Sequence, residues 1–383
     1  MATQIRSTQP QAQIRLLLRS GQFARDWIWA SRQQQQKAAI QGGTAKGPRR
    51  EDQVCLELNR SQQDARHRNN IRLLPGFDVE WVSAVASSRS EASKLSKRKM
   101  PSGGHGREVD VPVSASPIST LIVTTKAPSV VPSLALLRHR LSAESTVVFL
   151  QDGMGILDSV VDAFFANPKT RPSFILGLSS QSCHRNFPSA IPRIHWGGSA
   201  DATLSYGVIP SRPVTDELHS MFSSTKHPML NPQIDTTPDL AAHLPLTPTT
   251  SSLHYTLETL QLCTELRPTW LSLPSFQTRQ LQRLTAVSCI NPLSAIGDSL
   301  NGHLYGSSNF NSVARQLCQE ASNAFYAQRN PEKAFEGVFE DSHPLSAKQL
   351  YTETLNNLRR SPQAISSTLS DIRNQSERTE MYV

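Results

Sequence analysis

Short apolar runs alternate with segments of helical character between residues 117 and 272. Buried-type strands are predicted at 120–125, 146–150 and 174–178, and a helix at 130–141 separates the first two. Strands that alternate with helices along a chain usually assemble into a parallel sheet with helices on its faces. This stretch therefore predicts an α/β domain.

The first third of the chain has a weaker pattern. Three short strands are predicted there, at 13–18, 71–74 and 77–80. Polar and basic residues dominate 31–70 and 82–108, and segments so poor in apolar residues cannot bury enough surface to fold. We expect both to be disordered insertions, and the Pro/Thr/Ser-rich residues 208–252 to form a third.

After residue 272 the spacing of apolar positions becomes helical. Helices are predicted at 278–300, 312–327 and 347–358. Pro292, preceded by Asn291, predicts a break in the first of them, because proline cannot donate the backbone hydrogen bond of a helix interior. The chain therefore divides into an α/β domain at 1–272 and an all-α domain at 273–383.

The net charge of +8 is unevenly distributed. Residues 1–110 carry 19 Lys/Arg against 10 Asp/Glu (+9), while 111–383 carry 20 against 21 (−1). A basic front segment, densest at 89–107, could attract nucleic acid or an anionic surface. A solvated, partly disordered segment is the preferred interpretation.

The cysteines and the N-terminal residues indicate in which cellular compartment the protein is expected. The five cysteines are scattered, and none has C-x-x-C or metal-ligand spacing. They predict reduced thiols, an intracellular location and no metal site. Residues 1–25 contain arginines but no acid before Asp26, a pattern shared by organelle transit peptides, so the prediction is cytoplasmic or mitochondrial. No apolar run reaches the ~18 residues of a membrane span.

Candidate ligand-binding residues follow the first two buried strands. Lys126 comes just after the first strand, in Val-Thr-Thr-Lys-Ala, and Gln151-Asp152-Gly153-Met154-Gly155 comes directly after the second. Open α/β sheets bind ligands beyond the carboxyl ends of their strands. Glycines there allow the backbone to approach a phosphate or ribose closely.

Two further motifs lie in the helical part. Asn291 begins Asn-Pro-Leu-Ser-Ala, and Asn301-Gly302 follows ten positions later. The tail contains Ser366-Ser367-Thr368-Leu369-Ser370-Asp371-Ile372 and then Thr379-Glu380. Each motif alone is compatible with ordinary helix caps and charge pairs.

In this order, the four motifs resemble the ketopantoate reductase (2-dehydropantoate 2-reductase) family, particularly its fungal members. The resemblance runs from about Ile14 to the C-terminus and is strongest at 120–160 and 280–302. It implies a Rossmann-type NADP-binding domain followed by an all-α domain. It also implies NADPH-dependent reduction of ketopantoate, a 2-keto acid, to pantoate for pantothenate biosynthesis.

The resemblance also assigns site residues. Asn291, Asn301 and Ser367 match its substrate-binding positions, Arg283 falls on its catalytic position, and His195 resembles a histidine that borders the nicotinamide. The cofactor-binding residues that it implies are Arg19, Lys126, Gln151, Asp152, Gly153, Gly155 and Glu380.

Several positions depart from the family pattern. The chain starts at what should be the second strand and contains no G-x-G-x-x-G turn, so we expect the pyrophosphate cradle to be missing. The family's catalytic lysine is Arg283, which is a very poor acid, and the asparagine one helical turn later is Val287. The loop asparagine is Asp152, which we expect to add negative charge beside a polyanionic cofactor. The chain also ends before the family's closing helix.

These departures leave two functional hypotheses. The first is a ketopantoate reductase-like oxidoreductase of doubtful activity, which uses NADPH on a small 2-keto acid. The second is a catalytically inactive mitochondrial relative that binds RNA or protein through its basic front segment. A gene model that lacks its first exon would explain the missing turn but neither Arg283 nor Val287. The sequence does not determine the oligomeric state.

Overall fold

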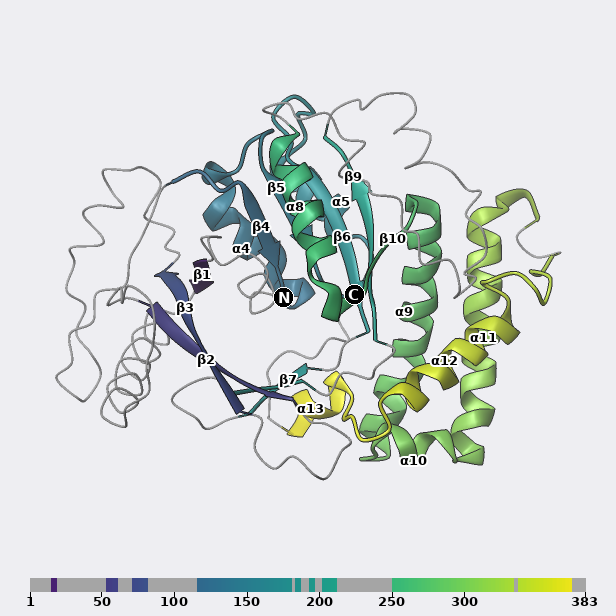
Figure 1. The fold of residues 1–383 in the computed structure, drawn as a ribbon. Coiled ribbons are helices and arrows are strands. Elements are labelled where there is room, and N and C mark those ends of the chain that lie inside the picture. The colour runs from purple at the N-terminus through teal and green to yellow at the C-terminus, as the bar shows by residue number, and fades with distance from the viewer. Residues whose placement is uncertain are drawn as a thin grey trace.

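The computed structural model describes residues 116–180, 202–211, 250–333 and 337–373. It also describes the backbone of five further strands (Figure 1). A five-stranded sheet has the order β10-β9-β6-β5-β4. Its strands are β4 (Thr120–Val123), β5 (Thr146–Phe149), β6 (Ser173–Ser179), β9 (Leu204–Ile209) and β10 (Pro268–Trp270). Strands β4, β5 and β6 are parallel, β9 runs antiparallel to β6, and β10 is parallel to β9.

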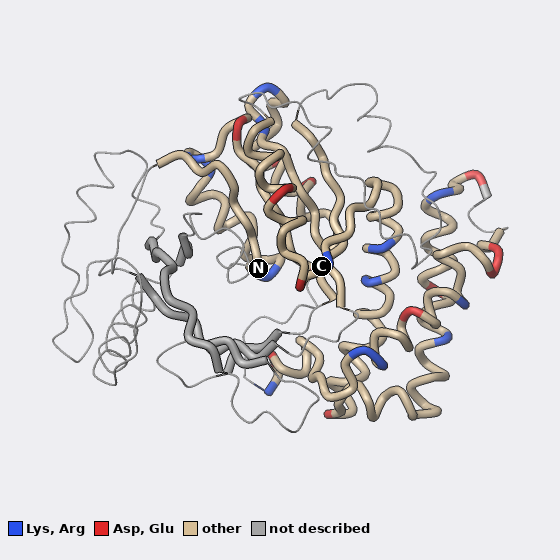
Figure 2. The backbone as a smooth tube through the Cα atoms, viewed as in Figure 1, with Lys and Arg blue, Asp and Glu red and all other residues tan. Residues whose placement is uncertain are grey.

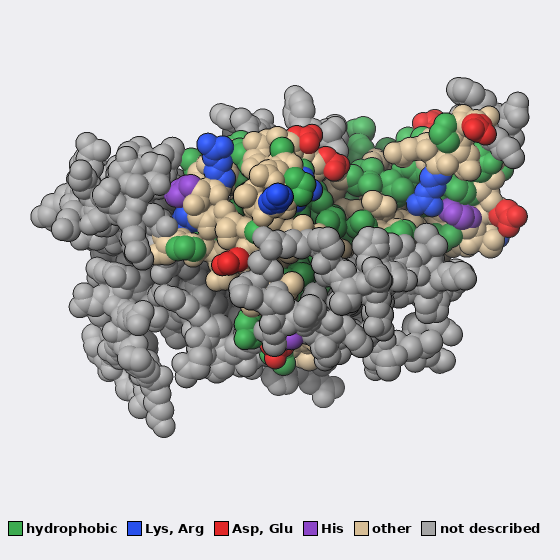
Figure 3. All heavy atoms as spheres, turned by 90° about the horizontal axis from the view of Figure 1, so that it is seen from above, with side chains coloured by type: hydrophobic (Ala, Val, Ile, Leu, Met, Phe, Trp, Pro, Cys, Tyr) green, Lys and Arg blue, Asp and Glu red, His purple; other side chains and the backbone are tan. Residues whose placement is uncertain are grey.

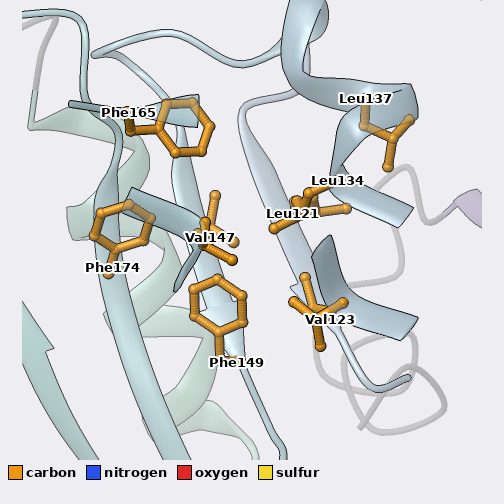
Figure 4. Packing of buried hydrophobic residues seen from close by; sticks show 10 residues of the cluster. Leu121, Val123, Leu134, Leu137, Val147, Phe149, Phe165 and Phe174 are labelled. Atoms are coloured by element: carbon orange, nitrogen blue, oxygen red, sulfur yellow. The ribbon is translucent and has the colours of Figure 1, made fainter. Parts of the chain in front are cut away.

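Helices cover both faces of this sheet because its central strands are apolar on both sides. On β5, Val147 and Phe149 face α4 (Val130–Leu137) and α5 (Ile156–Phe164), as Figure 4 shows for part of this cluster. Val148, between them, joins the opposite cluster with α8 (Ser251–Leu262). This alternation follows from the period of two along a strand.

A second sheet is formed by strands of which only the backbone is described. Its order is β1-β3-β2-β8-β7. The strands are β1 (Arg15–Leu18), β2 (Gln53–Arg60), β3 (Ile71–Trp81), β7 (Cys183–Asn186) and β8 (Arg193–Trp196). Strand β1 pairs with β3 in parallel, with Arg15 opposite Asp78, so these two strands do not extend the first sheet.

The C-terminal part is helical. Its helices are α9 (Leu273–Ile296), α10 (Asn301–Tyr305), α11 (Ser308–Arg329), α12 (Ala347–Arg360) and α13 (Ser367–Arg373). Helices α9, α10, α11 and α12 share a core that includes Ala286, Cys318 and Leu350, together with Leu345 just before α12. Short 3-10 turns complete the described elements, at Ala127–Ser129, Arg138–Arg140, Thr264–Leu266 and Pro331–Lys333.

Helix α9 joins the helical part to the sheet, beside its β9–β10 edge (Figure 1). Phe276 is fully buried there and packs with Leu178 and Leu271. It fits because Gly207 on β9 has no side chain: a Cβ at that position would lie 3.1 Å from Phe276 Cγ. This close approach fixes the start of α9 against the sheet.

The predicted α/β fold with a helical C-terminal part is confirmed, but four local predictions differ from the structure. Helix α9 continues through Pro292 instead of breaking there, and ends only at Ile296. A proline in a helix removes one hydrogen bond, and the buried side chains on both sides of it keep the helix docked. The predicted strands 71–74 and 77–80 form the single strand β3. Strand β2 lies in the predicted insertion 31–70, and helix α8 begins in the predicted insertion 208–252.

Candidate active site

Two loops at the carboxyl edge of the parallel strands carry predicted cofactor residues. Gln151 follows β5, and its Nε2 donates a hydrogen bond to the carbonyl oxygen of Val123, at the end of β4, over 3.2 Å. Gly153 and Gly155 have φ values of 120° and 79°, a left-handed backbone region that favours glycine. These glycines allow the tight turn that leads into α5.

Lys126, beyond the end of β4, reaches the helical part. Its Nζ donates to both carboxylate oxygens of Asp371 on α13, at 2.6 Å and 2.5 Å. The Lys126 side chain is 40% exposed and that of Asp371 only 14%. The ion pair therefore ties the ligand-binding edge of the sheet to α13.

Arg283 on α9 is held by two residues from other elements. Its Nε and Nη2 donate to Asp152 Oδ2 over 3.3 Å and 3.0 Å, and its Nη1 donates to Asn357 Oδ1 on α12 over 2.9 Å. The sequence analysis expects Asp152 to add negative charge beside a cofactor. In the structure its carboxylate is ion-paired with Arg283. Arg283 and Asp152, which both depart from the family pattern, therefore neutralise each other's charge.

A neutral polar group lies further along α9. Asn291 Nδ2 donates to Ser367 Oγ over 3.1 Å, which brings two predicted substrate residues together. Asn301, the third, lies on α10, where its N–H donates to the carbonyl oxygen of Ala364 over 3.2 Å. Gly302 approaches Pro362 so closely that a Cβ would lie 3.0 Å from its carbonyl oxygen, so glycine is needed beside Asn301. Val287 lies between Arg283 and Asn291 and offers no polar atom.

Several buried polar atoms around these residues have no hydrogen-bond partner among the described residues. They are Thr125 Oγ1 and Gln151 Oε1 at the sheet edge, and Asn301 Oδ1 and Thr368 Oγ1 in the helical part. Such atoms are costly to bury unless a ligand or water satisfies them. These atoms are therefore candidates for binding a polar ligand.

A pocket opens between the sheet and the first half of α9. The space that a water-sized molecule can reach inside it is about 30 Å³. Its walls come from β6, β9, α9 and α12, and its lining residues are Leu178, Ser179, Ser180, Thr203, Ser205, Arg279, Gln282, Arg283, Glu353, Asn357 and Arg360. Figure 2 shows the basic positions on α9 and near the end of α12. Burial and the like charges of Arg360 and Arg283 lower the pKa of Arg279, whereas Glu353 raises it.

Three other residues of the sequence analysis have no described side chain. Arg19 and Glu380 lie outside the described residues, and His195 is described only as a backbone position on β8.

Cys263, Cys289 and Cys318 are free and buried, and a hydrogen bond to Cys318 together with burial raises the pKa of Cys289. Within the described ranges, no group of His, Cys, Asp or Glu is arranged to hold a metal ion. No helix there is long and apolar enough to cross a bilayer.

Two family models match parts of this chain. Residues 76–206 match the family model "Ketopantoate reductase PanE/ApbA", and residues 275–383 match its C-terminal counterpart, "Ketopantoate reductase PanE/ApbA C terminal". The chain belongs to the ketopantoate reductase family. The second match contains the whole of α11, α12 and α13 and nearly all of α9, so the elements that carry Arg283, Asn291, Asn301 and Ser367 are family elements.

Curated relatives come from two yeasts. A protein of Schizosaccharomyces pombe described as "Probable 2-dehydropantoate 2-reductase" is 24% identical over 209 residues, which is 55% of this chain and 50% of that protein. A 2-dehydropantoate 2-reductase of Saccharomyces cerevisiae is 26% identical over 93 residues, 24% of each chain. The chain thus spans half the length of the first relative and a quarter of the second. A solved D-mandelate dehydrogenase with NADH and anilino(oxo)acetate has a TM-score of 0.48 at 11% identity, over 80% of this chain and 81% of that one.

The sequence analysis missed the contribution of α12. Glu353, Asn357 and Arg360 recur at intervals of four and three residues, which places them on one face of that helix. The spacing was visible in the sequence. What they face, Arg279 and Arg283 on α9, depends on the packing of the two helices.

Proposed function

We propose that this protein is a nicotinamide-dependent 2-keto acid reductase that converts 2-dehydropantoate to pantoate with NADPH. One observation carries the proposal: Ser367 and Asp371 lie four residues, one turn, apart on α13. Ser367 bonds the substrate-side Asn291, and Asp371 bonds the cofactor-side Lys126. The site would lie between the α/β residues 1–272 and the helical residues 273–383.

Five residues of the candidate site would bind the substrate or the cofactor in this reaction. The Asn291 amide and the Ser367 hydroxyl would donate hydrogen bonds to the substrate carboxylate. The buried Oδ1 of Asn301 would accept a hydrogen bond from a substrate hydroxyl. Lys126 and Gln151 would hold the ribose side of the cofactor, for which the unpartnered Gln151 Oε1 is suited. Bound NADPH would supply a hydride to the C2 carbonyl carbon.

The alkoxide that results also needs a proton. Arg283 holds its proton too strongly to give it up, so its role would be to stabilise negative charge on the carbonyl oxygen. Two of its N–H groups already bond Asp152 and a third bonds Asn357. We infer that the proton comes from water and that turnover is slow for that reason.

The test is a single-turnover measurement with the full chain. NADPH oxidation at 340 nm would be followed with excess enzyme and 2-dehydropantoate, and pantoate would be identified by mass. Activity that needs Asn291 and Ser367 supports the proposal. No pantoate after hours at enzyme concentrations above both dissociation constants would overturn it. NADH in place of NADPH tests the cofactor preference.

Three of the five N–H groups of Arg283 already bond protein acceptors, which favours a second candidate, an inactive relative that binds ligands without reducing them. The same experiment separates the two. Saturable binding of 2-dehydropantoate without any pantoate would favour the inactive scaffold, whereas a slow first turnover would favour the enzyme.

A further inference from the structure

The pocket beside α9 is unusual in its polarity. Of its lining side chains only Leu178 is apolar, whereas small-molecule pockets are mostly apolar. It contains three guanidinium groups, Arg279, Arg283 and Arg360, against one carboxylate, Glu353. At neutral pH these four groups sum to +2.

Protein partners balance two of the three positive charges. Arg279 Nη1 lies 3.7 Å from Glu353 Oε2, and Arg283 is paired with Asp152. Arg360, in the last turn of α12, forms no hydrogen bond or ion pair with another described residue. One positive charge of the pocket therefore remains unbalanced within the described part of the chain.

Arg279 lines the pocket together with two like charges, Arg283 and Arg360. Arg360 and Arg283 both lower the pKa of Arg279, and its side chain is only 24% exposed. Charges that are partly removed from water interact more strongly than charges at the surface. A bound anion would relieve this repulsion.

The opposite wall offers hydroxyl groups. Ser179 ends β6 and Ser180 follows it, whereas Ser205 lies on β9 and Thr203 precedes that strand. The Ser180 hydroxyl donates to the carbonyl oxygen of Thr203 and accepts its N–H, which fixes that part of the wall and leaves the Thr203 and Ser205 hydroxyls as the facing groups. Three guanidinium groups with a single carboxylate among the charged groups suit an oxyanion, which arginine binds in bidentate fashion.

We propose that this pocket binds a small dianion, a dicarboxylate or a phosphate, through Arg279, Arg360 and the facing hydroxyl groups. The space that a water-sized molecule can reach inside it is about 30 Å³, room for about two such molecules, which limits the ligand to a small anion whose charged group enters the pocket. The proposal does not depend on the reductase activity, since it concerns the half of α9 that precedes Asn291. Arg283 belongs to both sites, so occupancy of the pocket should influence the reductase site.

Calorimetric titration of the full chain at constant ionic strength tests the pocket without any cofactor. The probes are inorganic phosphate and malonate, with acetate as the monoanion. We expect saturable binding of at least one dianion, and at least about tenfold weaker binding of acetate. Phosphate binding alone would identify a phosphate site, and malonate binding alone a dicarboxylate site. No saturable binding of either dianion would overturn the proposal.

Two variants locate the bound anion. Arg360→Gln should weaken dianion binding at least about tenfold, since one charge-assisted hydrogen bond is lost. Arg359→Gln is the matched control: it makes the same charge change one residue away, where the guanidinium instead bonds the Tyr305 hydroxyl. Its affinity should stay within about twofold, because exposed charges are screened. Equal weakening by both variants would show a general charge effect and no site. Circular dichroism would confirm that both variants are folded.

Discussion

The two halves of α9 meet the rest of the molecule in different ways. The first half is anchored by the buried Phe276 and carries Arg279 and Arg283, whose charges are bound by Glu353, Asp152 and Asn357. The second half carries Asn291, a neutral amide that bonds Ser367 and keeps further hydrogen-bonding capacity. The charged groups of the first half thus already have protein partners, whereas the second half presents a neutral amide with unused hydrogen-bonding capacity. On the surface that Figure 3 shows from above, acidic and basic side chains are interspersed, so charge there gives no comparable division.

Phe276→Ala should have the largest effect, because it removes the anchor of the first half. The Phe276 ring is fully buried against the Gly207 backbone and Leu178. A Phe→Ala change in a core costs about 3–5 kcal/mol in the free energy of unfolding. Urea denaturation would measure it. Phe325→Ala, at a partly buried position on α11, should cost less. An equal loss in both variants would mean that Phe276 has no special role.

Asn291→Ala tests the second half. Loss of one preorganised donor typically lowers kcat about 10²–10³-fold, and we expect that range for kcat/KM with 2-dehydropantoate. The stability of the fold should change little, because Asn291 is only partly buried. Asn323→Ala, on the exposed face of α11, is the control and should keep full activity. An unchanged kcat/KM in Asn291→Ala would contradict the assignment of the substrate site.

The same contrast separates what the sequence could predict from what it could not: local patterns and motifs could be read, whereas contacts between distant elements could not. Strands β4, β5 and β6 and the long helices α9, α11 and α12 followed from apolar spacing, whereas β9 and β10 were not predicted. The family motifs supplied Lys126, Asn291, Asn301 and Ser367 as candidate site residues. The compensation between Asp152 and Arg283 could not be predicted, because 131 residues separate them and each looks like a defect alone. The pocket escaped prediction for the same reason, since four separate elements form it. Helix α9 continues through Pro292 because tertiary packing outweighs the lost backbone hydrogen bond.

Restoring the family residues in the first half should raise activity. The triple variant Asp152→Asn, Arg283→Lys and Val287→Asn supplies a proton donor and a second amide, and it removes the carboxylate that would otherwise hold the new lysine. A missing general acid costs about 10²–10⁴-fold, so kcat should rise about 10²-fold in single-turnover NADPH oxidation. Arg283→Lys alone should gain less, because Asp152 would still bind the ammonium group. A triple variant no faster than the original chain would show that Arg283 does not occupy the position of the proton donor.

The smallest expected effect concerns the turn that supports the first half of α9 from the other side. Gln282 Nε2 donates to the carbonyl oxygen of Pro344 over 3.0 Å, next to His343. The His343 ring stacks on Phe339 at 4.0 Å, and its Nδ1 accepts the N–H of Leu345 over 3.1 Å, which requires that nitrogen to be unprotonated. Burial and the positive charge of Arg329 lower the pKa of His343 below its usual 6.5.

The sign of the pH effect follows from this shift. Because the pKa is lower in the folded state, the unfolded chain binds the proton more readily, and His343 stabilises the fold only above pH ~6.5. That stability is lost as the pH falls through 6.5 and then through the lower pKa of the folded state. Urea denaturation at pH 7.5 and 5.0 should show a larger fall for the original chain than for His343→Gln, by less than ~1 kcal/mol. His303→Gln, at an exposed position on α10, should behave like the original chain. An equal fall in the original chain and in His343→Gln would mean that protonation of His343 does not disturb this turn, and that the first half of α9 depends on its arginine contacts alone.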